Sequence, residues 1–152
     1  MNADKKPDPR DVTRFKHTEL TDCILSVFYD VYNELGFGFL ESVYGKAMTI
    51  ALTSSGLAVA TECPVSVWFR DQQIADFRAD LVVNQLVLVE LKAVRSLEPS
   101  HEAQTLNYLR ATDLEVALLL NFGPKPQVRR LVFDNHRKNI SVNQRSSAAK
   151  GF

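Results

Sequence analysis

The spacing of apolar residues changes near Val59, and this change constrains the fold more than any other feature of the chain. Before it, apolar residues recur every three or four positions, which predicts a helix that Thr18 can cap and Gly36 can end, and a second helix over about Phe39 to Ser55. After it, apolar and polar residues alternate as far as Lys92, which predicts three consecutive strands joined by short turns. Two helices followed by a three-stranded meander are therefore expected.

Beyond Lys92 the pattern becomes helical again and then predicts two more strands. Pro99 can open a third helix that ends near Thr112. The segment from Val116 to Phe122 is almost entirely apolar, as expected of a strand buried on both faces, and a Gly-Pro-Lys-Pro turn leads into a last strand over Val128 to Phe133. The predicted order is helix, helix, three strands, helix, strand, strand, with no internal repeat.

The composition fits one globular domain. The chain has 152 residues, of which 45% are hydrophobic and 24% charged, and these values exclude disorder over the full length. Cys23 and Cys63 lack the spacing of a zinc or redox site, so two buried free thiols are expected. No stretch has the length of a signal peptide or a membrane span, and a soluble cytoplasmic protein without a membrane partner is therefore expected.

Charge is unevenly distributed along the chain, although the formal net charge is zero. Residues 1–16 carry 5 basic and 3 acidic side chains, residues 17–122 carry 6 and 14, and residues 123–152 carry 7 and 1. This pattern predicts a flexible segment over residues 1–17, a folded domain over residues 18–134 and a basic, disordered tail over residues 135–152. The tail is either a solvated end or a contact for nucleic acid or another partner.

Two carboxylates interrupt apolar strands of the predicted meander. Glu90 and Lys92 share one face of the strand that begins at Leu86, because side chains two residues apart point the same way. Asp80 lies in the preceding strand; a two-residue turn would put it on the face opposite to Glu90, whereas a three-residue turn or one bulge would pair the two. Paired carboxylates would repel and favour a bound divalent metal. The alternative is an ion pair that marks the end of the strand.

The predicted helices carry further polar candidates. His101, Gln104 and Tyr108 are three or four residues apart and therefore share one face of the third helix. Glu41 and Tyr44 share a face in the first turn of the second helix. Each set has an ordinary alternative, which is a partly exposed polar face for the first and a glutamate stabilised by the helix dipole for the second.

Taken in order, these motifs resemble those of a known family. The pattern Gly38-x-x-Glu41-x-x-Tyr44, then Asp80, then Glu90-x-Lys92, then Gln104-x-x-x-Tyr108 is similar to that of the GxxExxY proteins, a branch of the PD-(D/E)XK nuclease superfamily. The resemblance spans about Thr18 to Phe133, with Ala79 in place of the proline that names the superfamily. It implies an α/β, restriction-endonuclease-like fold in which a central mixed β-sheet is flanked by helices.

The resemblance also implies roles for the acidic residues and the lysine. Asp80 and Glu90 would bind Mg²⁺, or Mn²⁺ in its place, and Leu91 could add its backbone carbonyl. Lys92 would orient or help deprotonate the attacking water and offset charge in the transition state. Glu41 would complete the metal or water shell. The implied reaction is hydrolysis of a phosphodiester bond by a water that the metal activates.

Other residues would hold the substrate. By the same resemblance, Gln104 and Tyr108 would position the phosphate backbone. His101, which shares their helix face, and the basic residues Arg129 and Arg130 are further candidates for contacts with nucleic acid. DNA is favoured over RNA as the substrate, and a homodimer that cuts both strands is left open. The competing hypothesis is a non-catalytic nucleic-acid-binding or assembly module that keeps the nuclease fold, because the acidic middle of the chain would approach DNA poorly without a cation.

Overall fold

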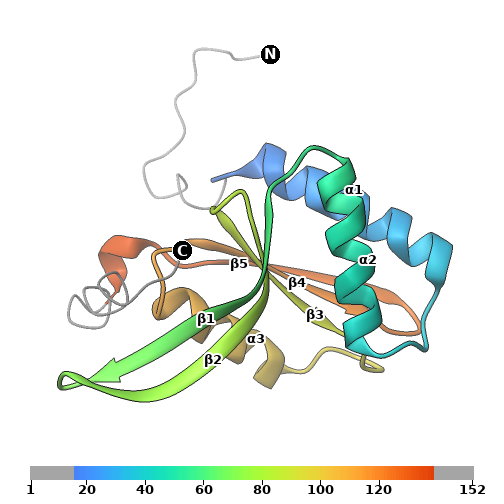
Figure 1. The fold of residues 1–152 in the computed structure, drawn as a ribbon. Coiled ribbons are helices and arrows are strands. Elements are labelled where there is room, and N and C mark those ends of the chain that lie inside the picture. Colours follow the sequence, from blue (N-terminus) through green and yellow to red (C-terminus); the bar gives the residue numbers. More distant parts are fainter. Residues whose placement is uncertain (1–15, 139–152) are drawn as a thin grey trace, which may run out of the picture.

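The computed structural model describes residues 16–138, which form one five-stranded mixed sheet with helices on both faces (Figure 1). The strand order is β1-β2-β3-β4-β5; β3 and β4 are parallel and the other neighbours are antiparallel. The predicted order of helices and strands and the α/β, restriction-endonuclease-like fold are confirmed. In chain order, the elements are α1 (Thr18–Leu35), α2 (Glu41–Ser54), β1 (Val59–Phe69), β2 (Gln72–Val83), β3 (Val87–Lys92), α3 (Pro99–Arg110), β4 (Val116–Phe122), β5 (Pro126–Val132) and the 3-10 helix η2 (Asn135–Arg137).

The sheet separates two apolar cores. Side chains of α1 and α2, including Phe28 and Met48, pack on one face against Val89 and Leu91 of β3. On the other face, Leu109 of α3 packs against Leu88 of the same strand. Strand β3 therefore contributes alternate residues to both cores, which explains why its sequence is apolar until the charged residues near its end.

The β1–β2 hairpin extends well beyond the rest of the sheet (Figure 1). Its strands pair with each other from Val59↔Val83 to Phe69↔Gln72, but β2 pairs with β3 only from Leu81 to Val83. We call residues 63–79 the hairpin arm. The base of the arm packs on α3, where the rings of Phe77 and Tyr108 lie 5.6 Å apart. A two-stranded ribbon has little stability of its own, so this packing supports the arm.

Several predicted boundaries are wrong by a few residues. The N-cap of α1 is His17 rather than the predicted Thr18; it lies in the left-handed region with φ 58°, and its side chain makes no capping hydrogen bond. Helix α2 begins at Glu41 rather than Phe39, because Leu40 still has extended backbone angles. Cys63 is buried as predicted, whereas Cys23 is only half-buried. No helix among residues 16–138 is both long and apolar enough to cross a membrane.

The start of the expected basic tail belongs to the folded part. Residues 135–138 were placed in that tail, but they form η2 and end at a buried lysine. The Lys138 ammonium donates hydrogen bonds to the carbonyls of Thr112 (2.7 Å) and Leu114 (2.6 Å). As part of the tail, Lys138 was expected to be solvated or to contact nucleic acid or another partner, but its ammonium is instead bound to the backbone of the folded domain. Residues 1–15 and 139–152 lie outside the described residues.

Candidate active site

The turn between β2 and β3 pairs the two predicted metal ligands. Val83 is opposite Val87, so the turn contains three residues, of which Asn84 and Gln85 have positive φ. This is the three-residue alternative. The last backbone pair between β2 and β3 is Leu81↔Val89, and the same register carried one residue further places Asp80 opposite Glu90 on one face of the sheet.

Beyond the Leu81↔Val89 pair, backbone amides of the two strands donate hydrogen bonds to carboxylates instead of to backbone carbonyls. The amide of Asp80 donates a 2.8 Å hydrogen bond to Oε1 of Glu90, and the amide of Leu91 donates a 2.8 Å hydrogen bond to Oδ2 of Asp80. Each carboxylate is thus held by a backbone N–H of the opposite strand. Both side chains are fixed in position by the fold before any ligand binds, which is the requirement for a pre-organised site.

Burial strongly raises the pKa of Glu90. Its residue is only 5% exposed, and burial together with the charge of Asp80 raises the pKa of Glu90 to about 8, against the lowering effects of the Asp80 amide and Lys92. Burial also raises the pKa of Asp80, although the Leu91 hydrogen bond and Lys92 oppose it. A strongly raised carboxyl pKa beside a second carboxylate is a feature of functional sites more often than of structural ones.

The donor set suits a hard divalent cation. Among residues 16–138, nothing donates a hydrogen bond to Oδ1 of Asp80 or Oε2 of Glu90, so each carboxylate keeps one oxygen for a ligand. Mg²⁺ prefers such oxygen ligands and commonly binds one or two carboxylates while keeping several waters. No group of three or more His, Cys, Asp or Glu side chains is arranged for metal binding within the described residues. Two carboxylates plus water fit Mg²⁺ better than an all-protein cage.

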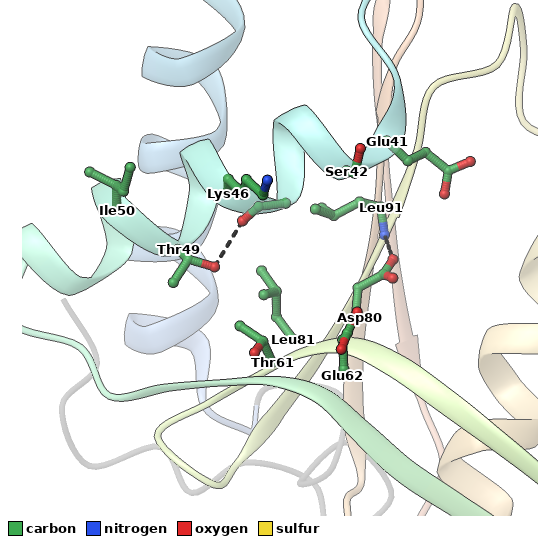
Figure 2. A pocket seen from close by; sticks show the side chains of 11 residues that line it. Glu41, Ser42, Lys46, Thr49, Ile50, Thr61, Glu62, Asp80, Leu81 and Leu91 are labelled. Carbon is green, nitrogen blue, oxygen red and sulfur yellow. Dashed lines mark hydrogen bonds between the residues drawn. The ribbon is translucent and has the colours of Figure 1, made fainter.

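A cavity of about 650 Å³ opens beside Asp80, between α2 and the β1–β2 hairpin (Figure 2). Glu41, exposed in the first turn of α2, lines it, and its charge contributes to the raised pKa of Glu90. Glu90 and Lys92 lie on β3 and do not line the cavity. The lining residues are Glu41, Ser42, Gly45, Lys46, Thr49, Ile50, Thr61, Glu62, Asp80, Leu81 and Leu91.

Glu62 is an acidic neighbour that sequence reasoning missed. The pairs Thr61↔Leu81 and Cys63↔Ala79 place it opposite Asp80, and its charge raises the pKa of Asp80. Its backbone has φ 50°, an uncommon value for a glutamate. Counting back along the hairpin from its turn would have placed Thr61 opposite Asp80, because the register shifts by one residue between Val67 and Trp68.

The predicted residues of α3 separate into two roles. Gln104 donates a 3.2 Å hydrogen bond to the hydroxyl of Tyr108. Burial raises the pKa of Tyr108, and so do the charges of Glu90 and Asp80, which puts this pair within electrostatic reach of the carboxylates. His101 instead caps the helix, since its Nδ1 accepts a 2.9 Å hydrogen bond from the amide of Glu98. This capping role was not foreseen.

Arg129 and Arg130 do not act as a pair. They are consecutive in β5 and therefore point to opposite faces of the sheet. Arg129 forms a 3.2 Å ion pair with Glu102 of α3, whereas Arg130 donates a hydrogen bond to the carbonyl of Lys16 near the start of α1. Because they lie on opposite faces, the two arginines cannot form one phosphate-binding patch, and a contact of either with nucleic acid stays a prediction.

Two buried polar residues hold the chain next to the site. The Tyr44 hydroxyl donates a 2.6 Å hydrogen bond to the carbonyl of Gly36 and accepts one from the amide of Phe39, which fixes the loop before Glu41. Asn121 of β4 binds both the amide (3.0 Å) and the carbonyl (2.9 Å) of Val94, just after Lys92. Asn121 was missed by sequence reasoning, because its partner lies 27 residues away in the chain.

Comparison with known proteins agrees with this geometry. The family model of the PD-(D/E)XK nuclease superfamily matches residues 18–131, and the chain belongs to this superfamily. No curated protein and no solved structure gives a significant match. The superfamily consists largely of nucleases that use divalent metals, and it implies a nucleic-acid substrate.

Proposed function

We propose that the protein is a Mg²⁺-dependent nuclease of the GxxExxY type that hydrolyses phosphodiester bonds, with DNA favoured over RNA as substrate. The observation that carries this proposal is the fixed pair of Asp80 and Glu90, each held by a backbone amide of the opposite strand with one oxygen left for a ligand. Lys92, two residues beyond Glu90, supplies a nearby positive charge that lowers the pKa of both carboxyl groups.

The side chains divide the work of an in-line hydrolysis. Asp80 and Glu90 would hold Mg²⁺, or Mn²⁺ in its place, which supplies Lewis acidity toward a phosphate and toward a water. Lys92 would orient the attacking water and offset negative charge on the phosphate in the transition state. Glu41, at the edge of the cavity, would accept a hydrogen bond from that water, and the Gln104–Tyr108 pair would hold the backbone of the substrate.

The test is metal-dependent cleavage by isosteric variants. Asp80→Asn and Glu90→Gln keep an oxygen that can accept the observed amide hydrogen bonds but remove the charge that binds the cation. We expect each to lower Mg²⁺-dependent cleavage of labelled DNA and RNA at least about a hundredfold, the typical scale for loss of one electrostatic contributor to a transition state. Asp76→Asn, an exposed carboxylate of the same strand, is the matched control. Cleavage by Asp80→Asn at the rate of wild type would reject the proposal.

A second candidate is a non-catalytic module that binds nucleic acid or takes part in an assembly. The observation that favours it is that each carboxylate already has a backbone partner, so the pair can serve as a fixed part of the strand junction without a metal. Calorimetric titration with Mg²⁺ and with Mn²⁺ separates the two. Heat of binding that disappears in Asp80→Asn supports the nuclease, and heat that is unchanged in that variant supports the module.

A further inference from the structure

A second cavity, of about 390 Å³, lies between the hairpin arm, α3 and η2. Its apolar lining includes Phe77 and Val67 of the arm and Phe133 after β5, and its polar lining includes Asn107, Arg110 and Arg137. It shares no lining residue with the cavity beside Asp80. Cavities of this size, mostly apolar with a few convergent polar groups, are the usual form of small-ligand sites.

Two guanidinium groups converge on one ring in this cavity. The guanidinium carbon of Arg137 lies 4.8 Å from the centre of the Phe133 ring, and that of Arg110 lies 5.9 Å from it. Both arginines are exposed, and neither forms an ion pair with a carboxylate of the described residues. Asn107 is 3.5 Å from the Arg110 guanidinium and holds it only weakly. The arrangement offers two positive charges beside exposed aromatic surface.

We propose that this cavity binds a nucleotide of the substrate strand, with the base against Phe77 and the phosphate on Arg110 and Arg137, which lie over Phe133. Planar guanidinium groups are suited to phosphate, and phenylalanine rings are the surfaces on which bases of single strands stack. A base inside a duplex is paired and stacked and cannot enter such a cavity without being extruded. The proposal rests on the proposed nuclease function and specifies its substrate as single-stranded or locally opened nucleic acid.

The path from this cavity to the carboxylates is short. Phe77, in the cavity wall, contacts Tyr108, whose pKa is raised in part by Glu90 and Asp80. Gln104 and Arg110 are six residues apart on α3, a rise of about 9 Å. Stacked nucleotides advance about 3.4 Å each along one strand, so a strand of about three nucleotides spans this distance. Along the axis of α3, one strand of this length can therefore extend from Arg110 to Gln104.

Binding of a labelled single-stranded oligonucleotide in EDTA tests this proposal without any cleavage. Arg110→Gln and Arg137→Gln should each weaken the affinity about tenfold, the effect of losing one charge-assisted hydrogen bond. Each should also reduce the slope of log affinity against log salt by about 0.7, the contribution of one phosphate contact to a single strand. Phe77→Leu should weaken the affinity at least about fivefold with the slope unchanged, because it removes stacking and no charge.

Arg70→Gln is the matched control, since Arg70 also lies over a phenylalanine ring, at the tip of the arm 4.9 Å from Phe69. An equal loss in Arg70→Gln would overturn the proposal, as would a duplex that binds as tightly as the single strand. If the affinity for thymidine monophosphate depended on both arginines and the affinity for the oligonucleotide did not, the cavity would be a site for free nucleotides. That result would overturn the assignment to the substrate strand. Binding in EDTA with the predicted losses, but no Mg²⁺-dependent cleavage, would reject the nuclease and leave this site standing.

Discussion

The single residue with the most revealing environment is Glu90. Its carboxyl group is buried next to Asp80, and the resulting pKa of about 8 means that the folded protein binds a proton at this residue that the unfolded chain, with a pKa of 4.5, releases. Between pH 4.5 and 8 the folded state therefore holds more protons than the unfolded state. By linkage, the contribution of Glu90 to stability falls as the pH rises through this window. The charge needed for metal binding is thus unfavourable for the fold.

Glu90→Gln should therefore stabilise the metal-free protein at alkaline pH. The neutral amide keeps an oxygen for the Asp80 amide and avoids a buried charge, so we expect a gain of about 2 to 4 kcal/mol at pH 8.5 that disappears near pH 5. Urea unfolding of both proteins in EDTA across this pH range measures the gain. A variant that is less stable than wild type at pH 8.5 would contradict the explanation.

Glu115 provides the control of opposite sign for this experiment. Although burial raises its pKa, hydrogen bonds from the Lys16 ammonium (2.6 Å) and the Asn135 amide (2.9 Å) together hold the pKa below its usual value. A carboxyl group with a lowered pKa stabilises the fold above its unfolded pKa and loses this effect as the pH falls. Glu115→Gln should therefore destabilise the protein at neutral pH, under the conditions in which Glu90→Gln begins to stabilise it.

At the scale of elements, the β4–β5 turn lies close against the segment between β3 and α3, and this contact fixes the chain that follows Lys92. A Cβ atom on Gly123, in the β4–β5 turn, would lie 2.3 Å from the carbonyl oxygen of Val94 and 2.9 Å from Nδ2 of Asn121. The first contact is with backbone, which cannot rotate away as a side chain can. This glycine allows the β4–β5 turn to lie against the segment between β3 and α3.

Gly123→Ala should cost about 1 to 3 kcal/mol of stability, the usual cost of overpacking, and should shift the segment after Lys92. Gly45→Ala is the matched control: it is in the middle of α2, and its new Cβ would meet only a Leu91 methyl at 4.0 Å, so it should stabilise by about 0.5 to 1 kcal/mol. Thermal unfolding measures the loss of stability in one variant and the gain in the other, and a cleavage assay measures the effect of each variant on the candidate active site. Equal melting temperatures for the two variants would show that the Val94 contact is unimportant.

Elements were more predictable than the contacts between them. The change of period at Val59 identified the meander, because alternation and helical spacing depend only on neighbouring residues. Whether Asp80 and Glu90 share a face depended on one residue in a turn, and both turn lengths were compatible with the sequence around Asn84 and Gln85. The Asn121–Val94 contact could not be predicted at all, since it requires the parallel pairing of β3 with β4.

For the whole molecule, the distribution of charge decides how a substrate can approach. Residues 17–122 carry 14 acidic and 6 basic side chains, and three of the acidic ones, Glu62, Asp80 and Glu90, gather at the site. The two arginines of the second cavity lie beyond Tyr108 from this cluster. A phosphate chain is therefore attracted by the arginines and repelled by the carboxylates unless a cation offsets the carboxylates.

This charge pattern predicts that removing the two carboxylates raises the affinity for nucleic acid without metal and has little effect with metal. In a Lys92→Met background, chosen to suppress cleavage, adding Asp80→Asn and Glu90→Gln should raise the affinity for single-stranded DNA about tenfold in EDTA, because two negative charges near the phosphates are gone. Mg²⁺ should raise the affinity of the Lys92→Met protein by a similar factor and leave that of the triple variant unchanged. Fluorescence anisotropy at 0.1 M salt measures all four values.

Asp30→Asn with Glu34→Gln, in the same background, provides the control for net charge. Both residues are exposed on α1, so the pair removes two negative charges away from the site. At 0.1 M salt the screening length is about 10 Å, and charges on α1 should therefore change the affinity much less than charges that face the substrate. The control could instead gain as much affinity in EDTA as the Asp80 and Glu90 variant and, like that variant, show no further gain with Mg²⁺. The effect would then come from total charge, and local repulsion at the site would be refuted.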